Sequence, residues 1–125
     1  MNYNKLMNDG LLKGKKGIIF GALNEKSIAW QVALKAHRQG AQLVLTNSPV
    51  AVRMGSINQL AEMTSSKVIV ADATSMVDID KLVSGSLEIF GGRFDFVLHS
   101  IGMSPNVRKD IPYENTSYEN MLKTF

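Results

Sequence analysis

Short apolar runs alternate along the chain with longer stretches in which apolar residues recur at helical spacing. The short runs are apolar almost throughout, which is typical of parallel strands that are covered on both faces. They are residues 17–20, 41–46, 67–71 and 94–98. The longer stretches predict helices at residues 27–39, 49–63 and 75–90, and from Thr116 onward. This alternation predicts an α/β fold, a Rossmann-like doubly wound parallel sheet of about four strands with crossover helices, incomplete within this chain.

The predicted helices begin and end at residues suited to those positions. Ser27, Ser48 and Ser75 are expected N-caps, because a serine side chain can accept a hydrogen bond from the first helical turn. Gly40 is expected to supply the C-cap of the first helix, and Gly55 weakens the second. The apolar face of the first helix is predicted to consist of Ile28, Val32 and Ala36, with Ala29 and Ala33 beside it.

Composition places the chain among ordinary globular proteins. Its 125 residues suffice for one compact domain, and 45% hydrophobic against 20% charged residues argues against disorder. No cysteine is present, which excludes a disulfide framework and a thiolate metal site, and no metal is expected. The net charge of +3 is compatible with an acidic partner, but a few extra surface lysines explain it better. For that reason nucleic acid is not expected as a partner. No stretch suits a signal peptide or a bilayer span, so a membrane is not expected either.

The loop after the first strand is the first candidate for ligand binding, since ligands of such sheets lie at the carboxyl ends of the strands. Gly21 would allow a sharp turn, and the helix that begins near Ser27 offers free N–H groups to a pyrophosphate. The Ser27 hydroxyl can donate to a phosphate or cap the helix. Only one glycine is present instead of the G-x-G-x-x-G pattern, so an ordinary strand–helix turn is an equally good interpretation of this segment alone.

The segment after the second strand bears on the choice of cofactor. Thr46, Asn47 and Ser48 stand where many nucleotide-binding folds carry an acid for the ribose 2′-hydroxyl. Without an acid, NAD is not favoured over NADP on this ground. Arg53 could meet a 2′-phosphate, although a solvated helix residue is the simpler interpretation.

Two further strand ends carry candidate residues. Asp72 could accept a hydrogen bond from an adenine amino group, with the Ala73 N–H beside it, or it could be a loop carboxylate near a helix N-terminus. After the fourth strand, Gly102 would let the backbone approach a flat ligand closely. His99 is interpreted as a packed residue at a strand end rather than a base.

Together these segments resemble a known family. Gly21-x5-Ser27-Ile28-Ala29, the Asp72 position and His99-Ser100-Ile101-Gly102 are similar to the cofactor site of enoyl-[acyl-carrier-protein] reductases, a divergent branch of the short-chain dehydrogenase/reductase superfamily. His-Ser-Ile-Gly in place of the superfamily's Asn-Asn-Ala-Gly is specific to this branch, as is the single-glycine loop with serine. The resemblance extends from about Leu12 to Phe125.

The resemblance implies a role for each candidate residue. Gly21, Ser27 and Ile28 would hold the pyrophosphate, Ser48 would lie near the adenosine ribose, Asp72 and Ala73 would flank adenine, Ile101 and Gly102 would line the nicotinamide ribose, and Ser104 would lie near the acyl substrate. Family members often carry glutamine at the Ser48 position and alanine at the Ser104 position. These two departures leave the cofactor preference and the substrate contact open.

The resemblance also implies the reaction. The family reduces the 2,3-double bond of an enoyl thioester on acyl carrier protein with NADH, or NADPH, in the cytoplasm, commonly as a homotetramer. A tyrosine meets the charge that grows on the thioester carbonyl, and a lysine holds the nicotinamide ribose. The family's Tyr-x6-Lys pair is absent here, since Tyr3, Tyr113 and Tyr118 are followed at that spacing by Gly10, Asn120 and Phe125. Residues 1–125 are therefore expected to be the N-terminal, cofactor-binding part of a single reductase domain, inactive alone and prone to self-association through the edge at 94–98.

Other classes remain as alternatives. A response-regulator receiver domain would use Asp72 as phospho-acceptor, but it needs an acidic pair for Mg²⁺ where this chain has Gly21-Ala22-Leu23-Asn24. A non-catalytic dinucleotide-binding module would suit the missing Tyr-x6-Lys pair. Another reductase of the superfamily is disfavoured by His99-Ser100 in place of Asn-Asn.

Overall fold

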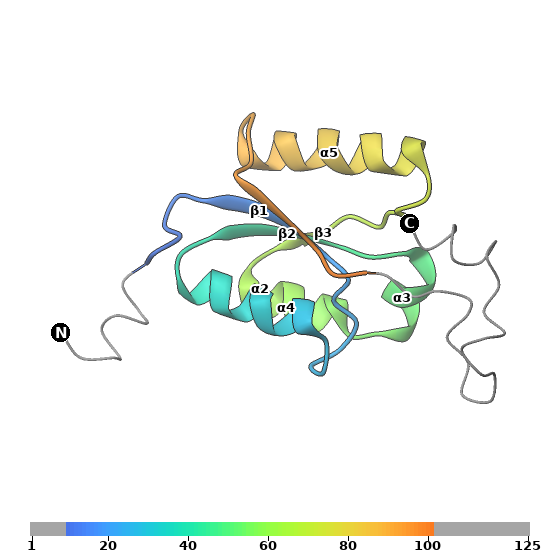
Figure 1. The fold of residues 1–125 in the computed structure, drawn as a ribbon, viewed down its shortest axis with the longest axis horizontal. Helices are drawn as coiled ribbons and strands as arrows, with labels where there is room; N and C mark the ends of the chain where they lie inside the picture. Colours follow the sequence, from blue (N-terminus) through green and yellow to red (C-terminus); the bar gives the residue numbers. More distant parts are fainter. Residues whose placement is uncertain (1–9, 102–125) are drawn as a thin grey trace, which may run out of the picture.

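A parallel four-stranded sheet forms the centre of the computed structural model, which describes residues 10–101 (Figure 1). The strands are β1 Lys16–Phe20, β2 Gln42–Thr46, β3 Lys67–Val68 and β4 Phe96–His99. The helices are α2 Ile28–Arg38, α3 Pro49–Met54, α4 Ile57–Thr64 and α5 Met76–Phe90. The predicted α/β fold class is confirmed, and the helix expected from Thr116 lies outside the described residues.

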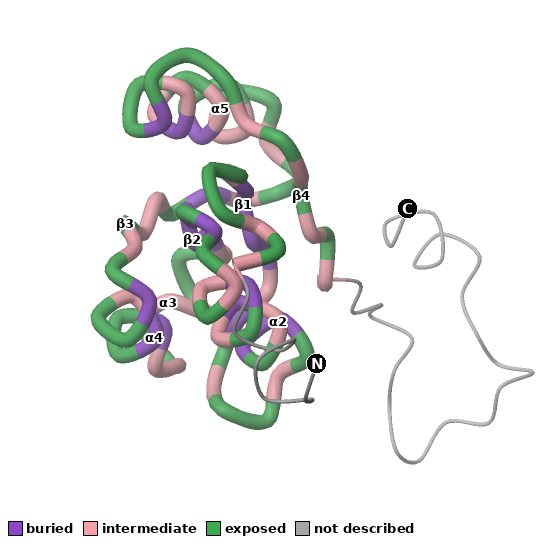
Figure 2. Tube along the Cα trace, turned by 90° about the vertical axis from the view of Figure 1, so that its left-hand side faces the viewer, coloured by how far each residue is buried: buried purple, intermediate pink, exposed green. Residues whose placement is uncertain are grey.

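The order of the strands places a topological switch point at β1. Across the sheet the order is β3-β2-β1-β4, and Ile18 of β1 pairs with Val44 of β2 and with Val97 of β4. The chain therefore moves from β1 outward to β3 and then returns through α5 to the other side of β1. Helices α2 and α4 cover one face of the sheet and α5 covers the other (Figures 1 and 2). In such folds, ligands bind where the strand order reverses.

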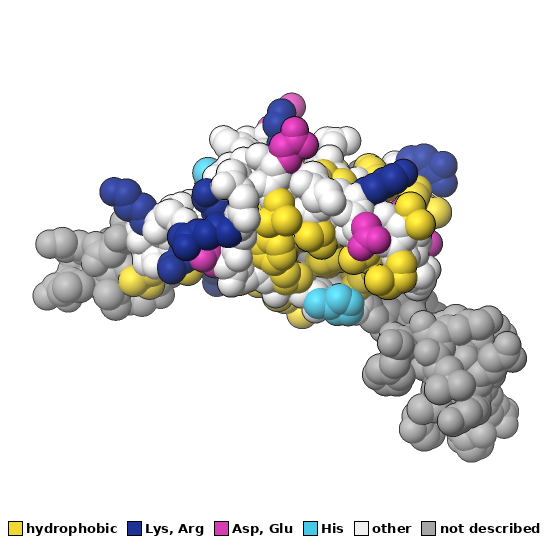
Figure 3. Space-filling view, turned by 90° about the horizontal axis from the view of Figure 1, so that it is seen from above, with side chains coloured by type: hydrophobic (Ala, Val, Ile, Leu, Met, Phe, Trp, Pro, Cys, Tyr) yellow, Lys and Arg dark blue, Asp and Glu magenta, His cyan; other side chains and the backbone are white. Residues whose placement is uncertain are grey.

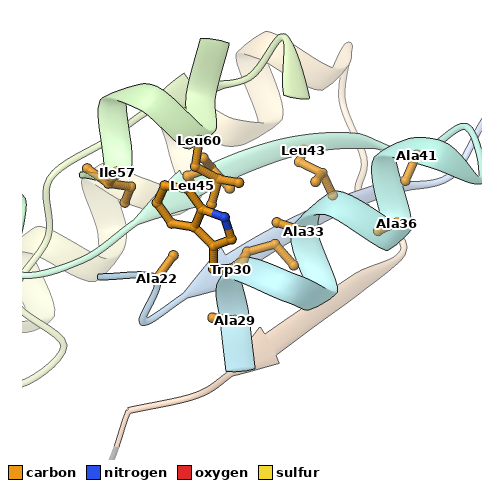
Figure 4. Close-up of a cluster of buried hydrophobic side chains, with 11 residues drawn as sticks. Ala22, Ala29, Trp30, Ala33, Ala36, Ala41, Leu43, Leu45, Ile57 and Leu60 are labelled. Carbon is orange, nitrogen blue, oxygen red and sulfur yellow. The ribbon is translucent and has the colours of Figure 1, made fainter. Parts of the chain in front are cut away.

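Two apolar cores lie on the two faces of the sheet, and β1 contributes side chains to both. Ile19 points into the core beneath α2 and α4, whereas Ile18 and Phe20 point into the core beneath α5. Figure 4 shows the first core, in which the Trp30 ring lies among the side chains of α4 and β2. The continuous apolar run of β1 is thus explained by burial on both faces.

The prediction that Ile28 belongs to the apolar face of the first helix was wrong. Ile28 is 74% exposed, whereas Trp30 is only 3% exposed and belongs to the core. Since successive helical residues are about 100° apart, these two side chains lie on opposite sides of Ala29. Helix α4 packs against α2 on the Trp30 side and leaves the Ile28 side open. The position of α4 therefore determines which side of α2 is buried, and the periodicity of α2 alone could not reveal that position.

The predicted helix at 49–63 is in fact two helices that meet at Gly55. Gly55 is extended, with φ −101° and ψ −166°, and a Cβ there would lie 2.3 Å from the Leu23 carbonyl oxygen. The next residue, Ser56, donates its backbone N–H to that same oxygen at 2.7 Å. The break therefore lets the segment after β2 hold the loop after β1.

The predicted third and fourth strands have shifted boundaries. Regular pairing in β3 covers only Lys67–Val68, although the Ile69 and Ala71 N–H groups still bond to carbonyl oxygens of the segment at the end of β2. Strand β4 begins at Phe96 instead of residue 94 and extends to His99. Just before it, Asp95 bonds to Lys16 at the start of β1: its carboxylate accepts the Lys16 N–H at 2.8 Å, and its own N–H donates to the Lys16 carbonyl oxygen at 2.6 Å.

The ends of the helices follow most of the expected signals. Ser75 caps α5 by accepting the Asp78 N–H at 3.2 Å, and Ser48 caps α3 by accepting the Ala51 N–H at 3.3 Å. Helix α2 ends one residue earlier than predicted, since Gln39 is its C-cap and Gly40 follows with φ +96°.

Candidate functional site

The carboxyl ends of β1 and β4 touch through Gly21. This residue has φ +100°, and a Cβ built on it would lie 2.1 Å from the Ser100 carbonyl oxygen and 3.0 Å from Cγ2 of Ile101. No side chain larger than hydrogen fits between these two backbones. Gly21 therefore both turns the chain out of β1 and lets the ends of the two strands approach at the switch point.

Ser27 organises the loop between β1 and α2 rather than the helix. Its Oγ accepts the backbone N–H groups of Leu23 and Asn24 at 3.0 and 3.1 Å. Although Ser27 occupies the N-cap position, within residues 10–101 its side chain makes no capping hydrogen bond, so the expectation of a side-chain cap was wrong. Because both lone pairs of the hydroxyl are engaged, its remaining capacity is to donate its proton.

The first turn of α2 is consequently left open for an anion. Its residues, Ile28 to Gln31, carry no acid. The Gln31 N–H bonds to the Ser27 carbonyl oxygen at 3.4 Å, whereas the N–H groups of Ile28, Ala29 and Trp30 receive no side-chain cap from Ser27. Free N–H groups and the positive end of the helix dipole favour a phosphate at this place. The exposed Ile28 is the first residue of this helix and directly follows Ser27.

Asn47 is a residue whose importance the sequence did not reveal. Its Nδ2 donates to the Ala22 carbonyl at 3.0 Å, its Oδ1 accepts the Ser48 N–H at 2.9 Å, and its backbone oxygen accepts the Ala71 N–H at 3.0 Å. One residue thus joins the ends of three strands. An asparagine just after a strand is the only signal in the sequence, and its partners are up to 25 positions away.

Three other residues at or after the end of β2 were candidates for contact with the cofactor or lie beside such candidates. The Ser48 hydroxyl is engaged in capping α3, and Arg53 is an exposed residue in the last turn of that helix. Thr46 is fully buried, and its Oγ1 has no hydrogen-bond partner within the described part of the chain.

Asp72 is held by its own loop. Thr74 donates both its backbone N–H, at 2.9 Å, and its hydroxyl, at 2.6 Å, to Oδ1 of Asp72. These donors hold the pKa of the carboxyl below its ordinary value of 3.8. The Asp72 N–H in turn bonds to Oδ2 of Asp78 at 2.9 Å, and Ala73 is exposed next to it. The carboxylate is therefore ionised and fixed at the end of the third strand segment.

The end of β4 differs from expectation at His99. Its side chain is exposed, because within residues 10–101 no strand lies beyond β4, and the ring stands 6.0 Å from that of Phe20, tilted by 40°. Ile101 is partly buried against the core beneath α5. Gly102 and Ser104, expected to line the nicotinamide and the substrate, lie outside the described residues.

The strand ends gather the predicted residues along one edge of the sheet. Gly21, Ser27 and Ile28 lie at the switch point with Ile101, and Asn47 connects this point to the end of β2 and to the segment that leads to Asp72. Residues 10–101 contain no group of acids and histidines that could hold a metal ion. Nor does any helix in that range have the length and apolar character needed to cross a membrane.

Comparison with known proteins identifies relatives of this chain. The family model described as enoyl-(acyl carrier protein) reductase matches residues 21–125. Enoyl-[acyl-carrier-protein] reductase [NADH] 2 of Rhizobium meliloti is 33% identical over 116 residues, which are 93% of this chain and 43% of that protein. The FabI protein of Aquifex aeolicus is 34% identical over 96 residues, 77% of this chain and 35% of its own length. The chain thus spans less than half the length of these relatives.

Solved structures share the fold as well. The FabI–NADH complex from Alistipes finegoldii superposes with a TM-score of 0.87 at 57% identity, covering 92% of this chain and 41% of that one. The enzyme from Aquifex aeolicus superposes with a TM-score of 0.78 at 33% identity, covering 91% of this chain and 44% of that one. The family match, the sequence similarity and the superposition together confirm the predicted resemblance, and the chain belongs to the enoyl-[acyl-carrier-protein] reductase family.

Proposed function

We propose that residues 1–125 are the cofactor-binding part of an NADH-dependent enoyl-[acyl-carrier-protein] reductase. The observation that carries this proposal is the geometry of the loop after β1. Gly21 allows the end of β4 to approach this loop. Ser27 precedes a helix that its side chain does not cap, and its hydroxyl can still donate one hydrogen bond. Relatives that share this part of the chain are named NADH reductases, and one similar structure is a complex with NADH.

Each residue has a part in seating the dinucleotide. The Ser27 hydroxyl and the first N–H groups of α2 bind the pyrophosphate, with Gly21 and Ile28 alongside. Ser48 lies near the adenosine ribose, and Asp72 accepts from the adenine amino group with Ala73 beside the base. Ile101 and Gly102 line the nicotinamide ribose, and Ser104 lies near the acyl chain.

NADH is preferred over NADPH in this proposal. A 2′-phosphate would need a cation near the end of β2, where the chain has Asn47 and Ser48. Arg53 is an exposed residue in the last turn of α3, away from the end of the strand in sequence. The relatives named as NADH enzymes support the same preference.

The whole protein would reduce the 2,3-double bond of an enoyl thioester carried by acyl carrier protein in fatty acid biosynthesis. The bound cofactor supplies the hydride, and the residues of this chain supply placement. The chain contains no Tyr-x6-Lys pair, so the groups that meet the developing charge on the thioester carbonyl are not among its residues. A cytoplasmic homotetramer is part of the proposal and follows from the family.

The test is NADH binding by the protein expressed from its complete reading frame. Replacing Ser27→Ala removes a donor to a charged phosphate, so the dissociation constant, followed by NADH fluorescence, should rise at least about tenfold. Ser84→Ala, an exposed serine of α5, is the matched control and should leave binding unchanged. A structure of the NADH complex with the phosphates away from Gly21 and Ser27 would overturn the proposal.

Turnover separates the enzyme from a module that only binds. The complete protein should oxidise NADH in the presence of a crotonyl thioester. Tight NADH binding without any turnover would instead favour the non-catalytic dinucleotide-binding module.

A further inference from the structure

We propose that Thr74 makes the cofactor site selective for adenine over bases that carry an oxygen in place of the amino group. Thr74 does so by fixing the orientation of the Asp72 carboxylate, and it is therefore a positioning residue rather than a contact of the base. This inference rests on the proposed placement of adenine beside Asp72.

Thr74 immobilises one of the two carboxylate oxygens. Its N–H and its hydroxyl both donate to Oδ1 of Asp72, at 2.9 and 2.6 Å. Two donors from one residue prevent the carboxylate from turning about its Cβ–Cγ bond without losing both hydrogen bonds. The hydroxyl bond is short, as expected when the acceptor is charged.

The backbone beneath the carboxylate is fixed as well. The Asp72 N–H bonds to Oδ2 of Asp78 at 2.9 Å, and the Ser75 N–H bonds to the Asp72 carbonyl at 3.0 Å. Ser75 and Asp78 belong to the cap of α5, so the loop is anchored to the start of a 15-residue helix. The backbone of Asp72 is therefore held in place by the start of α5.

The second carboxylate oxygen remains for a ligand. None of the hydrogen bonds within residues 10–101 uses Oδ2 of Asp72. The donors from Thr74 lower the pKa of this carboxyl, so at neutral pH Oδ2 can only accept. Adenine offers an N6 amino donor to such an oxygen.

Hypoxanthine reverses this chemistry. It carries an O6 acceptor where adenine has the amino group, and its nearest donor is the N1–H one ring position away. A fixed Oδ2 faces O6 and repels it. A carboxylate that could turn would follow the N1–H and lose the discrimination. The selectivity therefore depends on Thr74 as well as on Asp72.

The experiment compares dissociation constants for NADH and for reduced nicotinamide hypoxanthine dinucleotide, using the complete protein. The wild-type protein should bind NADH at least about tenfold more tightly, as expected for a hydrogen bond to a charged group. In Thr74→Val, which keeps the shape but loses the hydroxyl, this ratio should fall at least about threefold. Thr74→Ser restores the hydroxyl and should restore the ratio. Asp72→Asn can present an amide N–H to O6 and should bring the ratio to one or below.

The outcomes separate this inference from the proposed function. A wild-type ratio near one would contradict the placement of adenine beside Asp72. A wild-type preference that persists unchanged in Thr74→Val would overturn the role of Thr74 and leave the proposed function intact. Equal weakening of both ligands in Thr74→Val would mean that Thr74 only supports the loop, which also contradicts the inference.

Discussion

Replacing Gly21→Ala should damage both folding and cofactor binding, because Gly21 meets two separate constraints. Its φ of +100° lies in a region that residues with a Cβ rarely adopt. A Cβ would also lie 2.1 Å from the Ser100 carbonyl oxygen and 2.7 Å from its carbonyl carbon. The neighbouring atoms are backbone atoms of the chain that leaves β4, so they cannot rotate away as the end of a flexible side chain could.

The size of the effect follows from these two terms. A residue forced into a sparsely populated backbone region loses about 1–3 kcal/mol of stability. An additional methyl group in a fully packed place costs about 1–3 kcal/mol more, since the backbones must separate. Gly21→Ala should therefore lower the free energy of unfolding by about 2–6 kcal/mol. The separation also moves the loop after β1 away from Ile101, so NADH should bind more weakly.

Gly91→Ala provides the matched control. Gly91 has φ +80° as the C-cap of α5, but a Cβ there would meet nothing within 4 Å. Gly91→Ala should therefore lose only the stability that the unfavourable backbone conformation costs, about 1–3 kcal/mol. When folded, it should bind NADH as the wild-type protein does.

The assay is chemical denaturation of the complete protein together with an NADH titration at a denaturant concentration where each variant is folded. Gly21→Ala should be less stable than Gly91→Ala, and of the two variants only Gly21→Ala should lose affinity for NADH. Equal losses of stability and unchanged NADH binding in both variants would refute the argument that Gly21 is needed for the contact between β1 and β4.

Three further predictions follow from the same structure. Asn47→Ala should loosen the loop at Ala22 and weaken NADH binding several-fold with a loss of about 1–2 kcal/mol of stability, measured by titration and urea denaturation. Trp30→Ala should destabilise the fold by about 3–5 kcal/mol, whereas the exposed Ile28→Ala should change the unfolding free energy by less than about 0.5 kcal/mol. The Asp72 carboxyl should titrate below its ordinary pKa of 3.8 in NMR, so its stabilising contribution is present above that pH and is lost as the pH falls through the lowered pKa. In Thr74→Val the pKa should rise toward 3.8, and an unchanged value would contradict the donor role of Thr74.

Within residues 10–101 no strand lies beyond β4, and this edge bears on the behaviour of residues 1–125 on their own. Val97 is 49% exposed on β4, and Figure 3 shows hydrophobic side chains forming a patch in the middle of the face seen from above. Sheet edges of this kind invite pairing with another strand. Residues 1–125 alone should therefore self-associate. They should also show no turnover of a crotonyl thioester, because they contain no Tyr-x6-Lys pair. A monodisperse monomer in size-exclusion chromatography would argue against the first expectation, and a measurable rate against the second.

The local pattern of the sequence determined the elements and their order. Runs such as residues 17–20, apolar at every position, indicated strands buried on both faces, and the strand–helix alternation required parallel pairing. Residues suited to helix ends identified some of the boundaries, as Ser75 did for the start of α5. The single-glycine loop and the residues after β4 also identified the family, since that signal is contained in short contiguous segments.

Only the tertiary structure decided which side chains meet. The positions of Trp30 and Ile28 depend on the side on which α4 packs, and the break at Gly55 depends on a carbonyl oxygen 32 positions earlier. Asn47 and Thr74 looked like ordinary polar loop residues until their partners were known. Hydrogen bonds between strand ends join residues that are far apart in the sequence, and periodicity reports only the environment of neighbouring residues. The chain therefore encodes its strands locally and its site through contacts that exist only after folding.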